Sequence, residues 1–152
     1  RIKLRSLCRR GESMTSIVAD AKAGVMASDS NWFDQLEKGH CRKVYRIGGA
    51  LVGFAGTYRD ITNALEWFAS GREGKAPAGD VTALILTPGR IETWRPADGF
   101  MHEQSRQFAI GSGSACARAA MMAGADCAKA VRIACKIDPN SGGRVRVYSL
   151  EK

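Results

Sequence analysis

The period of the apolar residues changes several times along the chain, and the order of these changes is the strongest constraint on the fold. Short β-type runs come first, in TSIVAD, GVMASDS and KVYRIGGALVGFAG, with the turn signals AKAG and Gly48-Gly49 between paired runs. TYRDITNALEWFASG then adopts a helical period, and VTALILT, RIETW and QFAIG return to strand patterns. Two helical segments and an alternating strand end the chain. This order predicts an α+β layered sandwich with helices outside the sheets.

The boundaries of the predicted helices carry recognisable signals. In the first helix, Thr57 and Asp60 have capping-box spacing, and Gly71 is placed for a C-terminal cap. Residues 114–125 and 127–137 form the two later helices, which separate near Gly124. Asp138-Pro139 ends the second of these, because the residue before proline is biased away from helical conformation. Residues 144–150, RVRVYSL, alternate as a closing strand.

Composition narrows the class of protein. The chain has 152 residues and is 45% hydrophobic, which fits a single domain with a core. No apolar run approaches the roughly 20 residues needed to span a membrane. The five cysteines lack C-x-x-C spacing and are odd in number, so we expect reduced thiols in a cytoplasmic protein rather than disulfides. The two histidines, His40 and His102, are too isolated to indicate a metal site.

Half of the net charge of +8 lies in residues 1–14, which contain five basic residues and one acidic residue. Such a tail could bind nucleic acid or an anionic membrane, or could be part of a transit peptide. The simpler interpretation is a leader or upstream segment that is disordered or removed, because a well-patterned domain begins directly after Met14. We therefore expect one domain over residues 15–152 and no nucleic-acid or membrane partner.

Several short motifs could carry chemistry, although each has a structural explanation when taken alone. They are MTSIV, ASDS, CRKVYR, GFAG and IGSGS. An aspartate can cap a turn, a lysine in a basic patch is usually solvated, and a glycine-rich turn can simply join a strand to a helix. GSGS precedes a helix and could hold a phosphate there. It lacks the GK[ST] of a phosphate-binding loop and the G-x-G-x-x-G of a dinucleotide site, so no cofactor is expected.

Taken together and in order, these motifs resemble the proteasome β-type subunits, most closely the HslV type, within the N-terminal-nucleophile hydrolases. TSIV resembles the mature N-terminus of that family, and ASDS and CRKVYR resemble the segments with its active-site aspartate and lysine. LVGFAG, GSGS and DPNSGG resemble its oxyanion turn, its active-site serine turn and the proteasomal D-x-x-S-G-G. The catalytic residues that the resemblance implies are Thr15, Asp29, Lys43, Gly56, Ser112, Asp138 and Ser141.

The resemblance implies a threonine-type endopeptidase with the αββα sandwich of these hydrolases. It also implies a homo-oligomeric ring, a peptide or unfolded-protein substrate, and an AAA+ unfoldase as partner. Between GFAG and GSGS the chain is shorter than the HslV type, and residues 70–80 replace a second long helix, so one helical layer should be shortened. Small residues over 115–120 and an outward Trp67 are candidate contacts between subunits.

The chemistry requires Thr15 to be the first residue. A threonine hydroxyl needs a base, and a free α-amine on the same residue can serve, directly or through one water. Methionine aminopeptidases remove Met before small residues, so initiation at Met14 would expose Thr15, whereas an upstream start would require self-cleavage. Three alternatives remain: a catalytically inactive structural subunit of the same fold, a basic nucleic-acid-binding module, and a small-molecule amidase.

Overall fold

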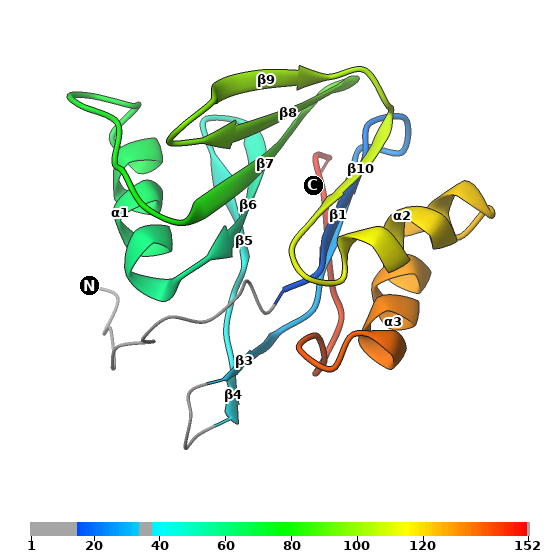
Figure 1. The fold of residues 1–152 in the computed structure, drawn as a ribbon. Coiled ribbons are helices and arrows are strands. Elements are labelled where there is room, and N and C mark those ends of the chain that lie inside the picture. Colours follow the sequence, from blue (N-terminus) through cyan, green and yellow to red (C-terminus); the bar gives the residue numbers. More distant parts are fainter. Residues whose placement is uncertain (1–14, 34–37, 152) are drawn as a thin grey trace.

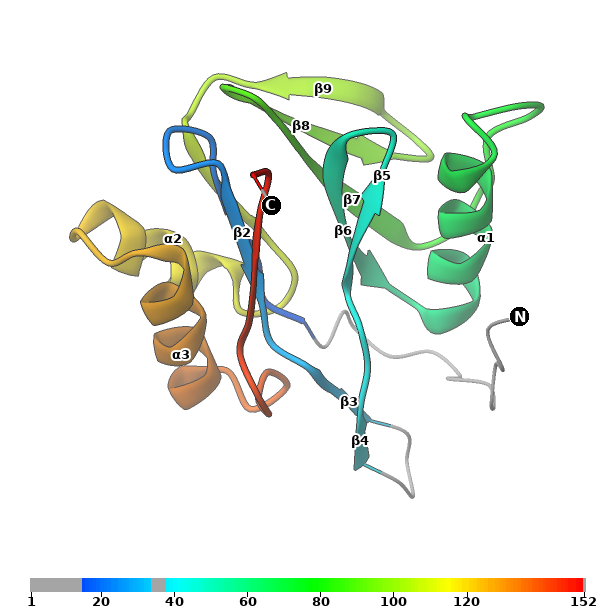
Figure 2. The same ribbon diagram turned by 180° about the vertical axis from the view of Figure 1, so that it is seen from behind.

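The structure, a computed structural model, describes residues 15–33 and 38–151 and consists of four layers (Figures 1 and 2). Two antiparallel sheets pack face to face, and helices cover their outer faces. The expected αββα sandwich is therefore confirmed. The basic segment of residues 1–14, interpreted from the sequence as a leader, lies outside the described residues.

The first sheet has the order β10-β1-β2-β11, so the start and the end of the domain lie in one sheet. Its strands are β10 (Gln107–Ile110), β1 (Ile17–Asp20), β2 (Val25–Ser28) and β11 (Arg146–Ser149). Two helices cover its outer face: α2 (Ser114–Met122) and α3 (Cys127–Ile137) (Figure 1). The turn between β1 and β2 and the closing strand were both expected from the sequence.

The second sheet has the order β5-β6-β7-β8-β9. Its strands are β5 (Val44–Ile47), β6 (Ala50–Gly56), β7 (Val81–Thr87), β8 (Arg90–Arg95) and β9 (Gly99–Glu103). Gly48 and Gly49 both have positive φ, 56° and 80°, which the tight turn between β5 and β6 requires. A separate ribbon pairs β3 (Asn31–Phe33) with β4 (Lys38–His40). Neither this ribbon nor β9 was predicted from the sequence.

Within the described residues, only α1 (Tyr58–Ala69) covers the outer face of the second sheet (Figure 2). Residues 70–80 follow it as turns and bends without a second helix, so the expected shortening of this layer is confirmed. Gly71 closes the helix with φ 79° and donates its N–H to the Phe68 carbonyl. The single helix nevertheless buries a continuous apolar face against β6 and β7.

Two local expectations for α1 were wrong in detail. Thr57 occupies the N-cap position, but its hydroxyl donates to the Asp60 carboxylate instead of accepting from the helix backbone. The same carboxylate accepts the N–H of Asp80, so the pair ties the start of α1 to the loop before β7. Trp67 does not face outward. Its ring packs 5.2 Å from the ring of Trp94 and 5.3 Å from that of Phe68 in an aromatic cluster.

Three clusters of buried apolar residues correspond to the three contacts between layers. The central cluster joins both sheets and includes Ile17 and Met26 from one and Leu51 and Leu84 from the other. A second cluster packs the first sheet against α2 and α3, and a third packs the second sheet against α1. Each strand in the centre thus buries both of its faces. This packing fixes the two sheets relative to each other, and with them the loops at their common end.

Candidate active site

The residues singled out in the sequence come from six different connections, and the topology brings them to one end of the sheets. Thr15 precedes β1 and Asp29 follows β2, and antiparallel pairing aligns Ile17 with Ser28. The same pairing aligns Ile17 with Ile110, so the turn carrying Ser112 lies at this end. In the second sheet, Lys43 precedes β5 and Gly56 ends β6. The loop after α3 contributes Asp138 and Ser141.

Asp29 is fully buried and binds three donors. Its Oδ1 accepts Lys43 Nζ at 2.8 Å and the N–H of Ser16 at 3.0 Å, and its Oδ2 accepts the N–H of Gly142 at 3.1 Å. Lys43 is also buried, with 6% of its surface exposed. A buried ion pair overcomes its desolvation cost only with good geometry and additional hydrogen bonds, and the two backbone donors supply these. Lys43 Nζ is thereby held by the same Asp29 oxygen that accepts the N–H of Ser16, the residue after Thr15.

Asp138 accepts hydrogen bonds from a second set of donors. Its Oδ2 accepts the hydroxyls of Ser112 and Ser141, each at 2.6 Å, and its Oδ1 accepts the N–H of Asn140 at 3.1 Å. Burial acts to raise the pKa of Asp138, but these hydrogen bonds and the charge of Lys43 outweigh it and hold the pKa below the usual value. The carboxylate is therefore ionised at neutral pH, where it can only accept hydrogen bonds.

Thr15 contacts the residues around Asp138 through Ser112 and Gly113. Its backbone nitrogen donates to Ser112 Oγ at 3.3 Å, and its carbonyl accepts the N–H of Gly113 at 3.3 Å. Ser112 has one proton, which goes to Asp138 at 2.6 Å rather than to the Thr15 carbonyl at 3.5 Å. Ser112 Oγ therefore presents a lone pair to the Thr15 nitrogen. Six of the seven predicted residues are thus brought together: Thr15, Asp29, Lys43, Ser112, Asp138 and Ser141.

Gly56, the seventh residue, ends β6 at the same end of the molecule. Its φ of 142° and the carbonyl of Asp80, against which any Cβ would collide, restrict this position to glycine. Phe54 donates its N–H to the Lys43 carbonyl, on the β5 side, and Thr57 donates to the Asp80 carbonyl, on the β7 side. Since successive N–H groups point to opposite edges of a strand, the Gly56 N–H is directed to the Lys43 side.

Sequence reasoning missed Ser16, Asn31, Gly113 and Gly142. Ser16 is fully buried, and its Oγ lies 2.7 Å from Ser141 Oγ. A Cβ on Gly113 would collide with this Oγ, and one on Gly142 would collide with the Asn31 side chain. The carbonyl of Gly142 accepts the N–H groups of both Ser30 and Asn31, at 3.1 Å each. The sequence offered little to indicate these residues: a serine in the apolar run TSIV points to Ser16, and a glycine after Ser141 points to Gly142.

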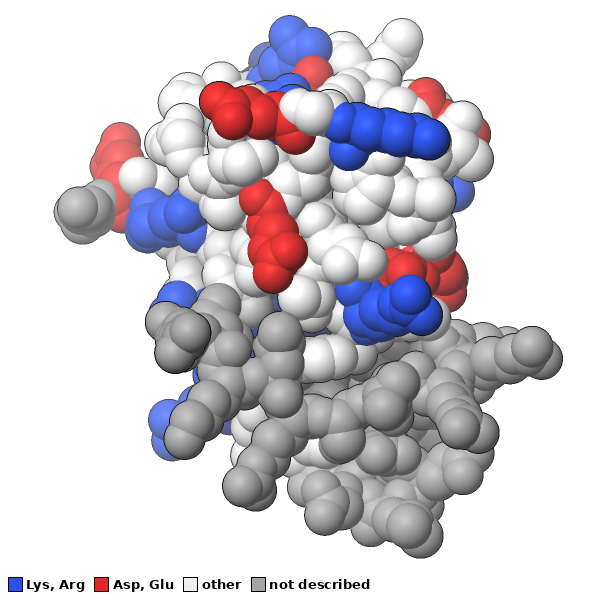
Figure 3. Space-filling model, turned by 90° about the vertical axis from the view of Figure 1, so that its left-hand side faces the viewer, with Lys and Arg blue, Asp and Glu red and all other residues white. Residues whose placement is uncertain are grey.

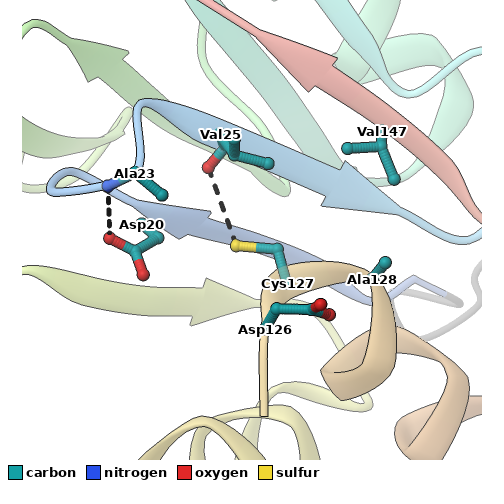
Figure 4. A pocket seen from close by; sticks show the side chains of 7 residues that line it. All are labelled: Asp20, Ala23, Val25, Asp126, Cys127, Ala128 and Val147. Carbon is teal, nitrogen blue, oxygen red and sulfur yellow. Dashed lines mark hydrogen bonds between the residues drawn. The ribbon is translucent and has the colours of Figure 1, made fainter. Parts of the chain in front are cut away.

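A hollow lies at the opposite end of β1 and β2 and does not belong to this site (Figure 4). It encloses about 260 Å³ and is lined by Asp20, Val25, Asp126, Cys127 and Val147 together with two alanines. The Cys127 thiol points at the Val25 carbonyl, and burial together with Asp20 and Asp126 raises its pKa to about 12. The thiol is thus protonated and unreactive. Among the described residues, no group of three His, Cys, Asp or Glu side chains could hold a metal ion.

Known proteins resemble this chain in structure. No family profile matches it, and no curated protein matches its sequence. HslV from Trypanosoma brucei superposes with a TM-score of 0.70 at 20% identity, covering 88% of this chain and 98% of its own. Thiobacillus denitrificans BPH in complex with epoxomicin gives 0.70 at 20% identity, covering 91% and 100%. BPH without a named ligand gives 0.66 at 19%, covering 90% and 98%. The chain therefore has the HslV-type fold that its motifs resemble.

The contact between Gly113 and Ser16 yields a test of this geometry. Gly113→Ala should destabilise the protein by about 1–3 kcal/mol, because the new Cβ overpacks against Ser16 Oγ. Combining it with Ser16→Ala should recover part of that loss, because the obstructing atom is gone. Urea unfolding of the two single variants and the double variant measures the coupling.

Ser28 provides the matched control for this cycle, since it is equally buried but its Oγ has no partner among the described residues. Gly113→Ala combined with Ser28→Ala should give additive losses. Additivity in the Ser16 pair as well would contradict the contact.

Proposed function

We propose that this chain is a threonine-type endopeptidase subunit in which Thr15 is the N-terminal nucleophile. The observation that carries the proposal is the hydrogen bond from the Thr15 nitrogen to Ser112, whose own proton is committed to Asp138. This arrangement orients a nitrogen at the position where an N-terminal nucleophile needs its base. The buried pair of Asp29 and Lys43 beside it, and the HslV-type fold, support the same assignment.

The mechanism begins with activation of the threonine hydroxyl. A free α-amine has a pKa of about 7.7–8, so roughly a tenth of it is unprotonated at pH 7. The nearby Lys43 charge would lower that pKa and increase the basic fraction. Ser112 accepts a hydrogen bond from the amine, which leaves the nitrogen lone pair to take the proton of the Thr15 hydroxyl, directly or through one water.

The bonds made and broken then follow. The Thr15 oxygen attacks the peptide carbonyl carbon, and the negative charge that develops on the carbonyl oxygen is stabilised by the Gly56 N–H, a contribution of about 3 kcal/mol. The protonated amine returns its proton to the leaving nitrogen, and the peptide bond breaks. An acyl ester on Thr15 remains. Water hydrolyses this ester, with the amine again as base, and releases the acid and the free hydroxyl.

This mechanism requires that the working chain begin at Thr15. We propose that residues 1–14 are absent from the active form, through initiation at Met14 and removal of that methionine, or through cleavage after it. The domain is then 15–152. The alternative is a catalytically inactive structural subunit of the same fold, which the Met14–Thr15 peptide bond favours as long as it remains intact, because an amide nitrogen is not a base.

The remaining assignments rest on the resemblance to the HslV type. We propose self-association in a ring, an unfolded or peptide substrate, an AAA+ unfoldase partner and a cytoplasmic location. The four described cysteines, all free thiols, support the location, and no described helix has the length and apolarity to cross a membrane. The α1 side of the molecule intersperses acidic and basic side chains and gives no support to a nucleic-acid-binding module (Figure 3).

Replacement of the nucleophile gives the primary test. Thr15→Ala should abolish hydrolysis of unstructured peptides while leaving the fold intact, because the hydroxyl is lost. Thr15→Ser should retain part of the activity. The intact mass of the purified protein, measured on the same preparation, reports whether residues 1–14 are present. A Thr15→Ala protein as active as the parent would exclude this mechanism, whereas a parent that starts at Thr15 and is inactive would favour the structural subunit.

Lys43 should act through the pKa of the Thr15 amine. Lys43→Met keeps the length of the side chain and removes its charge, so the amine pKa should rise and the activity at pH 7 should fall by up to about tenfold for each unit of that rise. Part of the activity should return above pH 8, where the amine loses its proton without help. The pH profile of kcat/KM measures both effects.

The exposed Lys129 on α3 provides the control for charge removal. Lys129→Met should leave the pH profile unchanged. An unshifted profile in folded Lys43→Met, as judged by circular dichroism, would remove Lys43 from the mechanism.

Assembly into a ring is the third test. Ala117 and Ala120 of α2 pack in the core of the chain itself, whereas Ala115 and Ala119 remain exposed and would let a neighbour approach closely. Light scattering at micromolar concentration should give a mass several times that of a single chain. A single-chain mass together with full activity on short peptides would contradict ring assembly. The similarity to the HslV type would then extend to fold and chemistry only.

A further inference from the structure

We infer that Ser16, the residue after the nucleophile, is a positioning residue that sets the direction of the hydroxyl protons beneath the Thr15 nitrogen. The inference rests on the proposed function for its catalytic consequence, but its structural basis is independent. Ser16 is fully buried, and its side chain reaches Ser141 across a sequence separation of 125 residues.

The direction of each hydrogen bond follows from counting protons. The hydroxyls of Ser112 and Ser141 both lie 2.6 Å from Asp138 Oδ2, and an ionised carboxylate has no proton to give. Each hydroxyl therefore donates its single proton to the hydrogen bond with Asp138. The 2.7 Å contact between Ser16 Oγ and Ser141 Oγ then has only one possible donor, which is Ser16. The protons run from Ser16 to Ser141 to Asp138, and from the Thr15 nitrogen to Ser112 to Asp138.

Ser16 also connects this network to the buried ion pair. Its backbone N–H donates to Asp29 Oδ1, the oxygen that holds Lys43, while its hydroxyl donates to Ser141. The close approach of Gly113 fixes where the Ser16 hydroxyl can lie. Ser16 thus connects the Asp29–Lys43 pair, whose charge is expected to lower the pKa of the Thr15 amine, to the Asp138 network, which orients that amine.

Loss of the Ser16 hydroxyl should weaken the network at Asp138. Ser141 would lose the donor that fixes its orientation and polarises its own O–H, so its hydrogen bond to Asp138 should weaken. The pKa of Asp138 should then rise, and Ser112 should be held less firmly under the nitrogen. The charged or titratable groups that face Asp138 are Lys43, the Thr15 amine in the active form, and Cys135. Burial and the carboxylates raise the Cys135 pKa to about 11, so that thiol stays neutral.

A titration tests the inference without relying on activity. The pKa of the Asp138 carboxyl is measured by carbon NMR of the full-length chain labelled at aspartate, in the parent, in Ser16→Ala and in Ser28→Ala. Ser28 is the matched control because it is a buried serine of the same sheet whose Oγ has no partner among the described residues. The Asp138 pKa should rise in Ser16→Ala and stay at the parental value in Ser28→Ala. An unchanged pKa in Ser16→Ala would overturn the inference.

Kinetics on the active protein supply a second readout. Ser16→Ala should lower kcat by about five- to tenfold, the effect of one neutral hydrogen bond, and leave KM unchanged. Because Ser16 acts through Ser141, the double variant with Ser141→Ala should be no slower than Ser141→Ala alone. If the kcat losses of Ser16→Ala and Ser141→Ala multiplied in the double variant, Ser16 would have a merely structural role. A parent protein that begins at Thr15 and has no peptidase activity would refute the proposed function, and the Asp138 titration would still decide the role of Ser16.

Discussion

The buried carboxylate of Asp29 is the interaction on which the rest of the site depends. A charge removed from water is tolerated only when its oxygens are fully bonded, and here three donors come from three distant parts of the chain: Ser16, Lys43 and Gly142. Removing any one of them leaves the charge less compensated. The segment before β1, the segment before β5 and the loop after α3 therefore meet at this carboxylate, and Thr15 directly precedes Ser16 there.

The four layers make this convergence possible. The central strands bury both faces, so the two sheets cannot slide relative to each other without opening the cluster around Ile17 and Leu84. Antiparallel pairing then decides which connections meet. The loops after β2 and β10 and the segment before β1 share one end because of register, even though they are far apart in sequence. Among the described residues, only α1 covers the outer face of the second sheet, and none of the residues grouped at this end comes from that helix.

The sequence predicted most of the fold, because strand period and glycine turns are local signals, and its ordered motifs singled out six residues that the structure brings together. What it missed depended on tertiary contacts. The strand β9 has little apolar alternation, and the Asp60 carboxylate accepts the N–H of Asp80 instead of capping α1. Trp67 is partly buried because its ring packs against rings from β8 and β9. The position of Ser16 in the site could not be predicted from its neighbours in sequence, because it depends on a contact with Ser141, which is distant along the chain.

The hydrogen bonds of Asp29 and Asp138 are already formed in the chain that carries residues 1–14. Asp29 takes no hydrogen bond from Thr15, and the proton of Ser112 is committed to Asp138 whatever the state of the Thr15 nitrogen. Under the proposed mechanism, release of the preceding residue changes only that nitrogen, from an amide without a usable lone pair to an amine with one. No side chain has to move, because the acceptor beneath it and the cation near it are already in place. Activation would then be a covalent event in a preorganised site rather than a conformational one.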